Sequence, residues 1–459
     1  MICNLEELKS IFNINQESDD ESIKIEGVST DTRSLKNNQI FIAIKGENFD
    51  GHSFVQKAIE IGARAIIVDE DYDISNLNFN NFIRVKDTIK AYGDIAKFYR
   101  LKNKFKVVAI TGSSGKTTTK DMVACVLSKK YKVEKTYKNN NNEIGLPFTI
   151  LNAEADTEVL VLEMGMRARG EIEYLTKVAQ PDIGIITNVG IAHIGELGSQ
   201  ENIMHSKGEL LENLPNDAIA IINGEDGFTD ELKKKFSGDI RVFGFNDNAT
   251  IKVENIAIQG KSSNFNITRN NISNNVTIKV KGEHLILDCL IAIETGLILG
   301  IDLDVAVEAL NHLEVSPGRL ELIEMENYLI INDTYNANPD SMKKSIDVLF
   351  SHEGNRIAVL GDMRELGENE VKYHEEIGRY LSGKGLKALV TVGELGKHIG
   401  LGLEKSENGT TPVYSYGNNL EAGKKLKDLV GEDDTILIKG SRAMAMEEII
   451  EILEEDKEV

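Results

Sequence analysis

Cysteine is scarce in this sequence of 459 residues. The three cysteines, Cys3, Cys125 and Cys289, lie far apart, and none belongs to a C-x-x-C motif. An odd number of distant cysteines argues against a disulfide framework and against a cysteine-based zinc site. We therefore expect the protein to work in a reducing compartment, the cytoplasm.

Basic residues are outnumbered by acidic ones. The chain has 52 lysines and arginines against 74 aspartates and glutamates, which gives a formal net charge of -22. This balance argues against broad contact with nucleic acid or with an anionic membrane surface. An acidic protein can still bind an anionic nucleotide locally, through a few cations, backbone N–H groups and Mg²⁺.

Targeting and membrane segments are also missing from the pattern. Residues 1–12 show no basic flank followed by an apolar core, so we expect no signal peptide. The most apolar long segment, residues 285–301, contains Asp288 and Glu294 and predicts a buried helix rather than a membrane span. No Ser-His-Asp order, His/Cys ligand cluster or dinucleotide-binding fingerprint stands out.

The residues that are present are typical of a globular protein, with 41% hydrophobic and 27% charged residues. A chain of 459 residues is too long for a single hydrophobic core. Changes in the pattern along the chain predict an N-terminal domain at residues 1–100, a central domain at residues 101–312 and a C-terminal domain at residues 313–459.

Short apolar runs alternate with helical segments along the whole chain. Continuous apolar runs are typical of parallel strands that are covered on both faces, so we predict an α/β fold with mostly parallel sheets. Residues 249–280 alternate between polar and apolar and predict antiparallel strands added to the central sheet. The predicted strands are 39–44, 65–68, 82–85, 107–110, 159–162, 183–187, 218–222, 328–331, 356–360, 388–392 and 435–438.

A glycine-rich stretch follows the apolar run at residues 106–110. It reads Thr111-Gly112-Ser113-Ser114-Gly115-Lys116-Thr117-Thr118-Thr119 and leads into a segment with helical apolar spacing. A strand, a glycine-rich turn and a helix start form an anion cradle, where backbone N–H groups and a lysine face phosphates and a hydroxyl reaches Mg²⁺. Ile110 stands in place of the first glycine of the usual motif, yet the context predicts a nucleoside triphosphate site.

Most apolar runs of the second and third domains end in polar or glycine-containing residues. Glu163, Asn188 and Asn332, for example, follow three of these runs. In open α/β sheets, ligands bind outside the carboxyl ends of the strands. One active site between the two domains best explains why both have polar strand ends.

Three side chains of the central domain are candidates for metal binding or catalysis. Glu163 can hold Mg²⁺ together with Thr117, because the ion at a phosphate loop needs an acidic ligand. His193 also follows a strand, although a lone histidine is more often structural. Lys207, within Ser206-Lys207-Gly208-Glu209, has the local composition of an ordinary surface lysine.

The C-terminal domain has two polar strand ends. Asp333-Thr334-Tyr335-Asn336-Ala337-Asn338-Pro339 offers an acid and amides that suit a ribose and an adenine, but an Asx-rich turn explains the composition equally well. Lys439 and Arg442 are two cations suited to a phosphate or a carboxylate. Arg319 follows Pro317-Gly318 near the predicted domain hinge.

The N-terminal domain has one comparable segment, Ser29-Thr30-Asp31-Thr32-Arg33. Hydroxyl groups together with an arginine suit a pyrophosphate. A plain polar turn before the next strand explains the same residues nearly as well. The residues alone leave both interpretations open.

Taken together, these motifs resemble those of the Mur ligase family of ATP-dependent amide ligases, over essentially the whole chain. Residues 111–118 are similar to the short phosphate loop of that family, which accounts for the missing first glycine. Residues 141–147, 163–165 and 188–193 resemble further family signatures. Asp333–Pro339, followed by Ser341-Met342, is similar to the type that adds D-alanyl-D-alanine.

The resemblance implies a role for each matching residue. Lys116 and Thr117 would hold ATP phosphates and Mg²⁺, with Glu163 as a ligand of the ion. His193 would hold a second Mg²⁺, and Lys207 would be the lysine that relatives carry as a carbamate. The remaining assignments are Arg319 to phosphates, Asp333 and Asn336 to ribose and adenine, Asn142 and Tyr335 to substrate, Lys439 and Arg442 to catalysis, and Ser29, Thr30, Asp31 and Arg33 to a UDP-sugar.

The sequence departs from the family pattern after Gly282-Glu283-His284. Relatives commonly carry asparagines near the adenine there, whereas this chain has Leu285 and Asp288. Adenine contacts from this segment are therefore in question.

The resemblance also implies a fold and an activity. The expected fold has a small UDP-sugar-binding domain, a central P-loop ATPase domain and a C-terminal Rossmann-like ligase domain. The expected reaction joins D-alanyl-D-alanine to UDP-N-acetylmuramoyl-tripeptide through an acyl phosphate, in a monomer that uses ATP and Mg²⁺ for peptidoglycan synthesis. Two alternatives stay open, a sister ligase that adds a single amino acid and a non-enzymatic P-loop switch.

Overall fold

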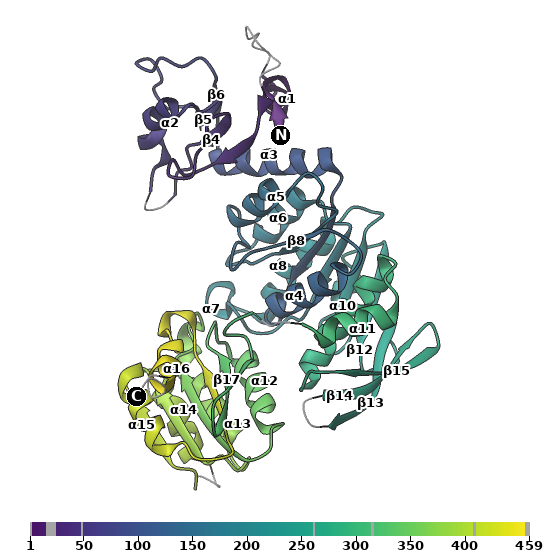
Figure 1. Cartoon of the computed structure of the whole chain (residues 1–459), viewed down its shortest axis with the longest axis vertical. Helices are drawn as coiled ribbons and strands as arrows, with labels where there is room; N and C mark the ends of the chain where they lie inside the picture. The colour runs from purple at the N-terminus through teal and green to yellow at the C-terminus, as the bar shows by residue number, and fades with distance from the viewer. Residues whose placement is uncertain are drawn as a thin grey trace.

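The protein was analysed as a computed structural model, which describes residues 2–14, 24–46, 49–259, 262–313, 316–406 and 410–454. Figure 1 shows three domains arranged along the longest axis, with the N-terminus at one end and the C-terminus at the other. Each domain is built around its own largely parallel sheet with helices packed on it. The predicted three-domain α/β fold is confirmed, while the residue limits of the domains stay a prediction.

The N-terminal domain contains a parallel sheet in the order β3-β4-β5-β6. Its longest helix, α3, packs against helices α5 and α6 of the central domain and so joins the two bodies (Figure 1). A second, two-stranded sheet pairs β1 with β2. The elements are β1 (Cys3–Asn4), α1 (Leu5–Ile11), β2 (Lys24–Ile25), β3 (Gly27–Ser29), β4 (Gln39–Ile42), η1 (Gly51–Phe54), α2 (Val55–Ile61), β5 (Ala65–Asp69), β6 (Phe82–Val85) and α3 (Thr88–Asn103).

The central domain contains a sheet of nine strands in the order β15-β14-β13-β12-β11-β10-β7-β9-β8. Strands β13, β14 and β15 pair antiparallel, which confirms the prediction for residues 249–280. The remaining neighbours pair in parallel. The strands are β7 (Lys106–Thr111), β8 (Val133–Lys135), β9 (Val159–Glu163), β10 (Ile183–Ile186), β11 (Ile219–Asn223), β12 (Asp239–Gly244), β13 (Ile251–Gln259), β14 (Ser262–Arg269) and β15 (Ile272–Ile278).

Helices cover both faces of the central sheet, which explains why its strands have continuous apolar runs. Alternate residues of β7 enter two separate cores: Val107 and Ala109 one of them, Val108 and Ile110 the other. The predicted buried helix at residues 285–301 corresponds to α10. The helices are α4 (Lys116–Leu127), α5 (Gly145–Asn152), α6 (Glu171–Ala179), α7 (Ile194–Leu197), α8 (Gln200–Glu212), α9 (Thr229–Lys233), α10 (Glu283–Ile298) and α11 (Leu303–Asn311).

The C-terminal domain contains a sheet in the order β16-β17-β21-β18-β19-β20, in which only the pairing of β16 with β17 is antiparallel. Its strands are β16 (Glu321–Glu324), β17 (Tyr328–Asp333), β18 (Asn355–Gly361), β19 (Ala388–Val392), β20 (Val413–Tyr416) and β21 (Asp434–Lys439). Its helices are α12 (Pro339–Phe350), η2 (Gly367–Asn369), α13 (Glu370–Leu381), α14 (Gly396–Glu404), α15 (Asn419–Leu429), η3 (Arg442–Met444) and α16 (Glu447–Glu454).

Two predictions about whole segments can be compared with this fold. Across the described part of the chain, no helix has the length and apolar character needed to cross a bilayer. Cys3, Cys125 and Cys289 are all free thiols.

The carboxyl ends of β7, β9 and β10 lie next to one another in the central sheet, which places their polar loops together.

Candidate functional site

The glycine-rich loop joins the end of β7 to the start of α4. Gly115 caps the helix with a φ of 81°, in the left-handed region that favours glycine. A Cβ atom at Gly112 would lie 1.9 Å from Thr187 Oγ1, so the loop follows this path only with glycine there. Lys116 Nζ donates to the Gly112 carbonyl oxygen at 2.8 Å. The local structure is therefore the strand, tight turn and helix start that the sequence predicts.

Burial lowers the pKa of Lys116, and the Arg319 guanidinium lowers it further, while Glu163 opposes the shift. Among the residues that the structure describes, none forms an ion pair with the Lys116 amine, so a bound anion would supply the missing opposite charge. Both the charge of Lys116 and the geometry of the loop therefore favour phosphate binding at this position.

Glu163 ends strand β9 beside the phosphate loop. One carboxylate oxygen accepts a hydrogen bond from Thr117 Oγ1 at 2.8 Å, and the other accepts one from Asn141 Nδ2 at 2.9 Å. Only 3% of the Glu163 surface is exposed. A buried carboxylate with neutral partners and a hydroxyl beside it form a set of hard oxygen ligands, which suits Mg²⁺.

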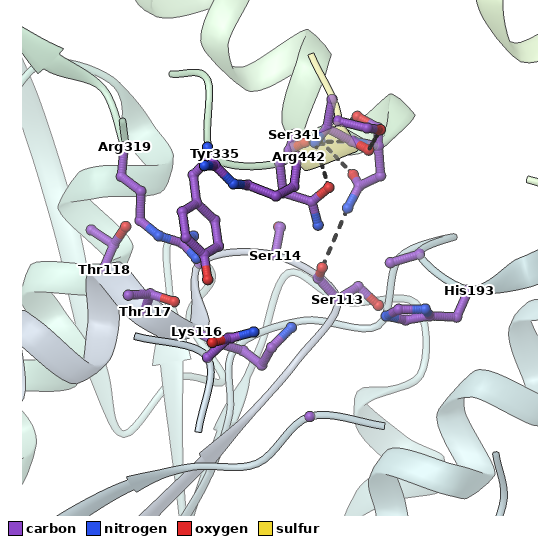
Figure 2. A pocket seen from close by; sticks show the side chains of 18 of the residues that line it. Ser113, Ser114, Lys116, Thr117, Thr118, His193, Arg319, Tyr335, Ser341 and Arg442 are labelled. Carbon is purple, nitrogen blue, oxygen red and sulfur yellow. Dashed lines mark hydrogen bonds between the residues drawn. The ribbon is translucent and has the colours of Figure 1, made fainter. Parts of the chain in front are cut away.

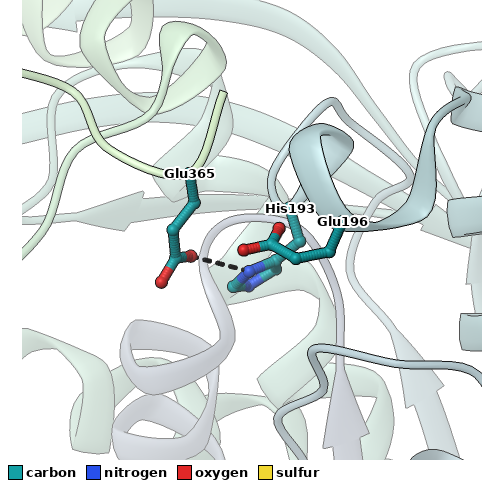
Figure 3. Close-up of side chains that lie close together, drawn as sticks. All are labelled: His193, Glu196 and Glu365. Carbon is teal, nitrogen blue, oxygen red and sulfur yellow. Dashed lines mark ion pairs between the residues drawn. The ribbon is translucent and has the colours of Figure 1, made fainter. Parts of the chain in front are cut away.

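His193 lies in the loop after β10, in a left-handed backbone conformation with a φ of 63°. Its Nδ1 atom lies 2.8 Å from Glu365 Oε2 of the C-terminal domain, so the ion pair crosses the domain boundary. The close approach of His193 lowers the pKa of Glu365. Figure 3 shows Glu196 beside this pair, and the three residues offer ligand atoms within 4.8 Å of one another.

Lys207 is buried in helix α8, with 1% of its surface exposed. The interpretation as a surface lysine is therefore wrong, because this face of α8 packs into the domain. Throughout the described ranges, no residue forms a hydrogen bond or ion pair with its amine. Burial moves the pKa of Lys207 well below its ordinary value, and the charge of Lys116 adds to this shift.

The C-terminal domain supplies a second wall, centred on Asp333 at the end of β17. Lys439 Nζ donates to Asp333 Oδ2 at 2.5 Å and to the Asn336 carbonyl oxygen at 2.9 Å. Ser345 Oγ donates to the same carboxylate oxygen of Asp333 at 2.5 Å. This buried network fixes the loop after β17 against the end of β21.

Arg319 packs its guanidinium over the ring of Tyr335, with 4.0 Å between the guanidinium carbon and the ring centroid. Stacking of this kind orients the planar cation while its N–H groups stay available to an anion. Figure 2 shows Arg319 and Tyr335 above the side chains of the phosphate loop. Arg442 lies at the same side and pairs with Glu447 at 2.5 Å.

A cavity of about 780 Å³ separates the two walls and is lined by both domains (Figure 2). Most of the predicted site residues of these domains line it. They are Ser113, Ser114, Gly115, Lys116, Thr117, Thr118, Asn142, Glu163, His193, Arg319, Asp333, Tyr335, Asn336, Lys439 and Arg442. The structure thus brings together side chains separated by more than three hundred positions, such as Lys116 and Lys439.

Other predicted residues do not line this cavity. Thr111 is buried below the loop and donates to the Met164 carbonyl oxygen at 3.0 Å, and Gly112 lies beside it. In the N-terminal domain, Arg33 pairs with Asp31 at 2.6 Å, and Ser29 Oγ donates to the Asp31 carbonyl oxygen at 2.8 Å. Ser29, Thr30, Asp31 and Arg33 form a polar turn at the carboxyl end of β3, separate from the cavity.

Several cavity residues were not predicted to belong to the site. His284, in the first turn of α10, has its Nε2 atom buried without a hydrogen-bond partner among the described residues. Burial lowers the pKa of His284 to about 3, with smaller contributions from Lys344 and Lys439. The ring is therefore neutral and has a free polar atom that a ligand can engage.

The segment that departs from the family pattern also faces the cavity, through Leu285 and Asp288. Asp288 Oδ1 accepts a hydrogen bond from Thr119 Oγ1 at 3.0 Å. Burial raises the pKa of Asp288 to about 7, against opposing effects of Lys344 and Thr119. Lys344, on α12, is a further cavity residue without a predicted role, because a lysine on an amphipathic helix carries no sequence signal of its own.

Comparison with known proteins gives a consistent result over the whole chain. The Mur ligase family catalytic domain matches residues 24–100, the Mur ligase middle domain matches residues 110–296, and the Mur ligase glutamate ligase domain matches residues 318–442. A UDP-N-acetylmuramoyl-tripeptide–D-alanyl-D-alanine ligase from Bacillus subtilis is 39% identical, over 94% of this chain and 94% of the relative.

Solved structures are similar to the same extent. The crystal structure of MurF from Acinetobacter baumannii has a TM-score of 0.88 and 31% identity, covering 98% of each chain. The MurF ligase from Thermotoga maritima in complex with ADP has a TM-score of 0.85 and 29% identity, covering 95% of this chain and 99% of that one. The similarity includes all three domains and is not confined to the phosphate loop.

Proposed function

The chain belongs to the Mur ligase family, and we propose that it joins D-alanyl-D-alanine to UDP-N-acetylmuramoyl-tripeptide with ATP, in the synthesis of the peptidoglycan precursor. It is an ATP-dependent ligase, as are its relatives. The observation that carries the proposal is the cavity in which the phosphate loop of one domain faces Asp333, Asn336 and Lys439 of the other. The expected fold, activity and use of ATP are thereby supported, and neither alternative gains an observation of its own.

Two chemical steps follow from this activity. The free carboxylate of the tripeptide attacks the γ-phosphorus of ATP, the bond to the bridging oxygen breaks, and an acyl phosphate and ADP result. The amine of D-alanyl-D-alanine then attacks the acyl carbon, loses a proton and displaces inorganic phosphate. Water must be kept away from the acyl phosphate, and closure of the two domains around the cavity would serve this purpose.

Charge stabilisation is the main task of the protein in both steps, because each step builds negative charge on oxygen atoms. Lys116 and the backbone N–H groups at the start of α4 would face the phosphates of ATP, with residues Thr111 to Thr118 as the cradle. Arg319 would bind phosphate from the opposite wall. Its stacking on Tyr335 supports this role, since the guanidinium is already oriented.

Thr117 and Glu163 would hold the Mg²⁺ that accompanies ATP. Their oxygen atoms lie 2.8 Å apart, and the ligand set of a hydroxyl and a buried carboxylate fits this ion. When bound, Mg²⁺ neutralises phosphate charge and acts as a Lewis acid. The residues of the chain orient the nucleotide so that its γ-phosphate meets the substrate carboxylate.

A second Mg²⁺ would be held by His193 together with Lys207 in its carbamate form. The lowered pKa of the unpaired Lys207 amine supports this proposal, because only the unprotonated form of an amine attacks carbon dioxide. In that reaction the Lys207 nitrogen bonds to the carbon, loses a proton and becomes an anionic group with two oxygen atoms. The buried position that makes a free lysine unfavourable then becomes a position for a metal ligand.

Further substrate contacts are proposed for the remaining site residues. Asp333 and Asn336 would contact the ribose and the adenine of ATP, while Asn142 and Tyr335 would contact the amide-forming substrates. Lys439 and Arg442 would stabilise phosphate or carboxylate groups near the reacting atoms. The polar turn Ser29 to Arg33 would bind the UDP-sugar in the N-terminal domain.

The organisation of the protein is proposed along the same lines. The N-terminal UDP-sugar-binding domain would span residues 1–100, the central domain 101–312 and the C-terminal domain 313–459. The enzyme would act as a monomer in the cytoplasm, and three free cysteines support a reducing compartment.

One assay tests the proposed reaction. ADP release is measured with UDP-N-acetylmuramoyl-tripeptide and D-alanyl-D-alanine together, with each substrate alone and with single amino acids in place of the dipeptide. We expect ADP release only with both substrates, and we expect Lys116→Ala to abolish it. Turnover that does not depend on the dipeptide, or that accepts a single amino acid equally well, would contradict the proposal.

A further inference from the structure

The N-terminal end of helix α12 lies directly on the phosphate loop, although the two belong to different domains. Asn338 Nδ2 donates to the Ser113 carbonyl oxygen at 3.4 Å. The backbone N–H of Ile191, in the loop after β10, donates to Asp340 Oδ2 at 2.9 Å. The first turn of α12 is therefore seated against the two loops that surround the proposed phosphate position.

Lys344 lies one helical turn farther along α12 and lines the cavity. Its Nζ atom donates to Ser114 Oγ at 2.9 Å. Within the part of the chain that the structure describes, no carboxylate lies within 4.0 Å of this amine. Its positive charge is thus held at the phosphate loop by a neutral hydroxyl alone.

Other cations of the same wall are bound differently. Lys439 pairs with Asp333 at 2.5 Å, and Arg442 pairs with Glu447 at 2.5 Å. Lys344 interacts electrostatically with two carboxylates, Asp226 and Asp288. Burial raises the pKa of both, and the charge of Lys344 opposes that rise. Lys344 therefore adds positive charge to a cavity that already contains Lys116 on the other side of the loop, an arrangement that an anionic ligand would stabilise.

We propose, building on the proposed function, that Lys344 is a second phosphate-binding lysine, supplied by the C-terminal domain to the triphosphate of ATP. On nucleotide binding its amine exchanges the Ser114 hydroxyl for a phosphate oxygen. A charge-assisted hydrogen bond replaces a neutral one, and the side chain needs little movement because it already lies over the loop. The lysine thereby links ATP binding on one domain to the position of the other.

A purely structural role would have a different consequence. If Lys344 only fastened α12 to the loop, its loss would weaken every ligand that needs the two walls together. A phosphate contact discriminates between nucleotides, since adenosine monophosphate lacks the phosphates that the loop binds. The comparison of triphosphate with monophosphate binding separates the two roles.

The experiment measures dissociation constants by calorimetry on the full-length protein with Mg²⁺. The probes are a non-hydrolysable ATP analogue and adenosine monophosphate. We expect Lys344→Met to weaken binding of the analogue roughly 10- to 100-fold and to change monophosphate binding less than about 2-fold. Lys344→Arg keeps the charge and restores most of the affinity, whereas Lys344→Gln, without the charge, behaves like Lys344→Met.

Lys343→Met is the matched control, because it removes the same charge from the neighbouring position of the helix. Lys343 does not line the cavity, and its amine lies 5.9 Å from the centroid of the Tyr380 ring. We expect the Lys343→Met variant to bind the analogue with the same affinity as the unmodified protein. Thermal unfolding of each variant verifies that the helix is intact.

Three results would overturn the inference. If Lys344→Met and the unmodified protein bind the analogue equally well, Lys344 does not bind phosphate. The proposed function would not be affected by that result. Equal weakening of the triphosphate and the monophosphate would make Lys344 a docking contact. Failure of the unmodified protein to bind the analogue would contradict the proposed function and the inference together.

Discussion

At the scale of single residues, burial shifts three ionisable groups toward their neutral forms: His284 and Asp288, which line the cavity, and Lys207, which is buried in α8. Lys207 has its pKa lowered, His284 has its pKa lowered to about 3, and Asp288 has its pKa raised to about 7, each chiefly by burial. A buried ionisable group without a partner lowers the stability of the fold, and a bound ligand or ion offsets that loss. Their shifts lead to two predictions.

Replacing Lys207 by methionine should raise stability while abolishing ligation. Because the pKa of Lys207 is lower in the folded protein than its ordinary value of 10.5, folding releases protons, and wild-type stability rises with pH up to 10.5. Lys207→Met avoids this cost, so we expect about 1–3 kcal/mol more stability at pH 7 without Mg²⁺ and bicarbonate. Denaturant unfolding at pH 7 and pH 9 measures it, and the advantage should shrink at the higher pH.

The opposite outcome for Lys207 is equally informative. A wild-type protein more stable than Lys207→Met at pH 7 would mean that the amine has a partner in solution. Retained ligase activity in the variant would exclude Lys207 as a metal ligand.

Asp288→Asn should change the pH dependence of stability. The pKa of this carboxyl is raised from its ordinary value of 3.8 to about 7, so the folded protein binds an extra proton between these values. Wild-type stability should therefore fall as the pH rises through this window, by about 1.4 kcal/mol per pH unit at most, and level off above it. The asparagine variant keeps an acceptor for Thr119 and lacks this contribution. Unfolding titrations between pH 4 and pH 8 with parallel slopes for both proteins would contradict the assignment.

At the scale of elements, two helix N-termini converge on the cavity from different domains. Helix α4 begins at the phosphate loop, and helix α12 begins at Asn338, which closes a capping box with Ser341. Both ends present N–H groups and the positive end of the helix dipole. The Asn338 side chain thus has two tasks, since it caps its own helix and contacts the loop of the other domain.

Asn338→Ala should affect both stability and ATP use. Loss of the cap lowers the free energy of unfolding by about 1 kcal/mol. The Michaelis constant for ATP should rise as well, because the first turn of α12 loses its contact with Ser113. Asn418→Ala is the matched control: Asn418 caps α15 by accepting from the Glu421 backbone N–H at 3.0 Å, and it does not line the cavity. Steady-state kinetics showing equal Michaelis constants for both variants would exclude a role of the cap in nucleotide binding.

Some strands of the fold were not predicted from the sequence. Strands β3, β8, β16 and β20 were not predicted, and all four lie at sheet edges; the interior strand β12 was also not predicted. The residues of the four edge strands are mostly half-buried or exposed, so they lack the continuous apolar runs that identify interior strands. Interior strands such as β7 and β9 were predicted within a residue or two, because burial on both faces requires apolar residues throughout.

At the scale of the whole molecule, the central and C-terminal domains meet beside the cavity through polar contacts and through the apolar packing of Ile194. The polar contacts include those of Asp340 with Ile191, Glu365 with His193 and Lys344 with Ser114. Relative motion is the ordinary expectation for an interface between two domains of one chain unless it is large and hydrophobic. Closure over bound ATP and UDP-linked substrate is therefore a prediction, and compaction in solution scattering on adding both ligands would support it.

Gly190→Ala should hold the two domains apart. A Cβ atom at this position would lie 2.1 Å from Asp340 Oδ2, so the Asp340 side chain must turn away and give up its hydrogen bond with the Ile191 N–H, which links α12 to the loop. We expect a larger radius of gyration and a fall in kcat/KM of roughly 10- to 100-fold, because a small displacement misaligns the two walls. Gly227→Ala is the control, since a Cβ atom there meets nothing within 4 Å. Scattering curves identical to wild type for Gly190→Ala would show that the contact tolerates the methyl group.

Local chain order was enough to determine the three-domain α/β fold, the phosphate loop and the polar strand ends. These features depend on residues close in sequence: a glycine where the backbone turns, a lysine beside it, and apolar runs that burial on two faces demands. The family strings at Asp333–Pro339 and at residues 188–193 are local in the same sense. They predicted the ligase activity without any knowledge of how the domains meet.

Only the tertiary structure decided which side chains lose contact with water and which meet across the domain boundary. Lys207 has the neighbours of a surface residue in the sequence, yet α8 turns it inward, and burial lowers its pKa. Lys344 lies 230 positions from Ser114 and contacts it because α12 is seated on the phosphate loop. Burial and long-range contacts depend on how the helices and strands pack together. That packing is determined by residues throughout the chain and not by the sequence around a single residue.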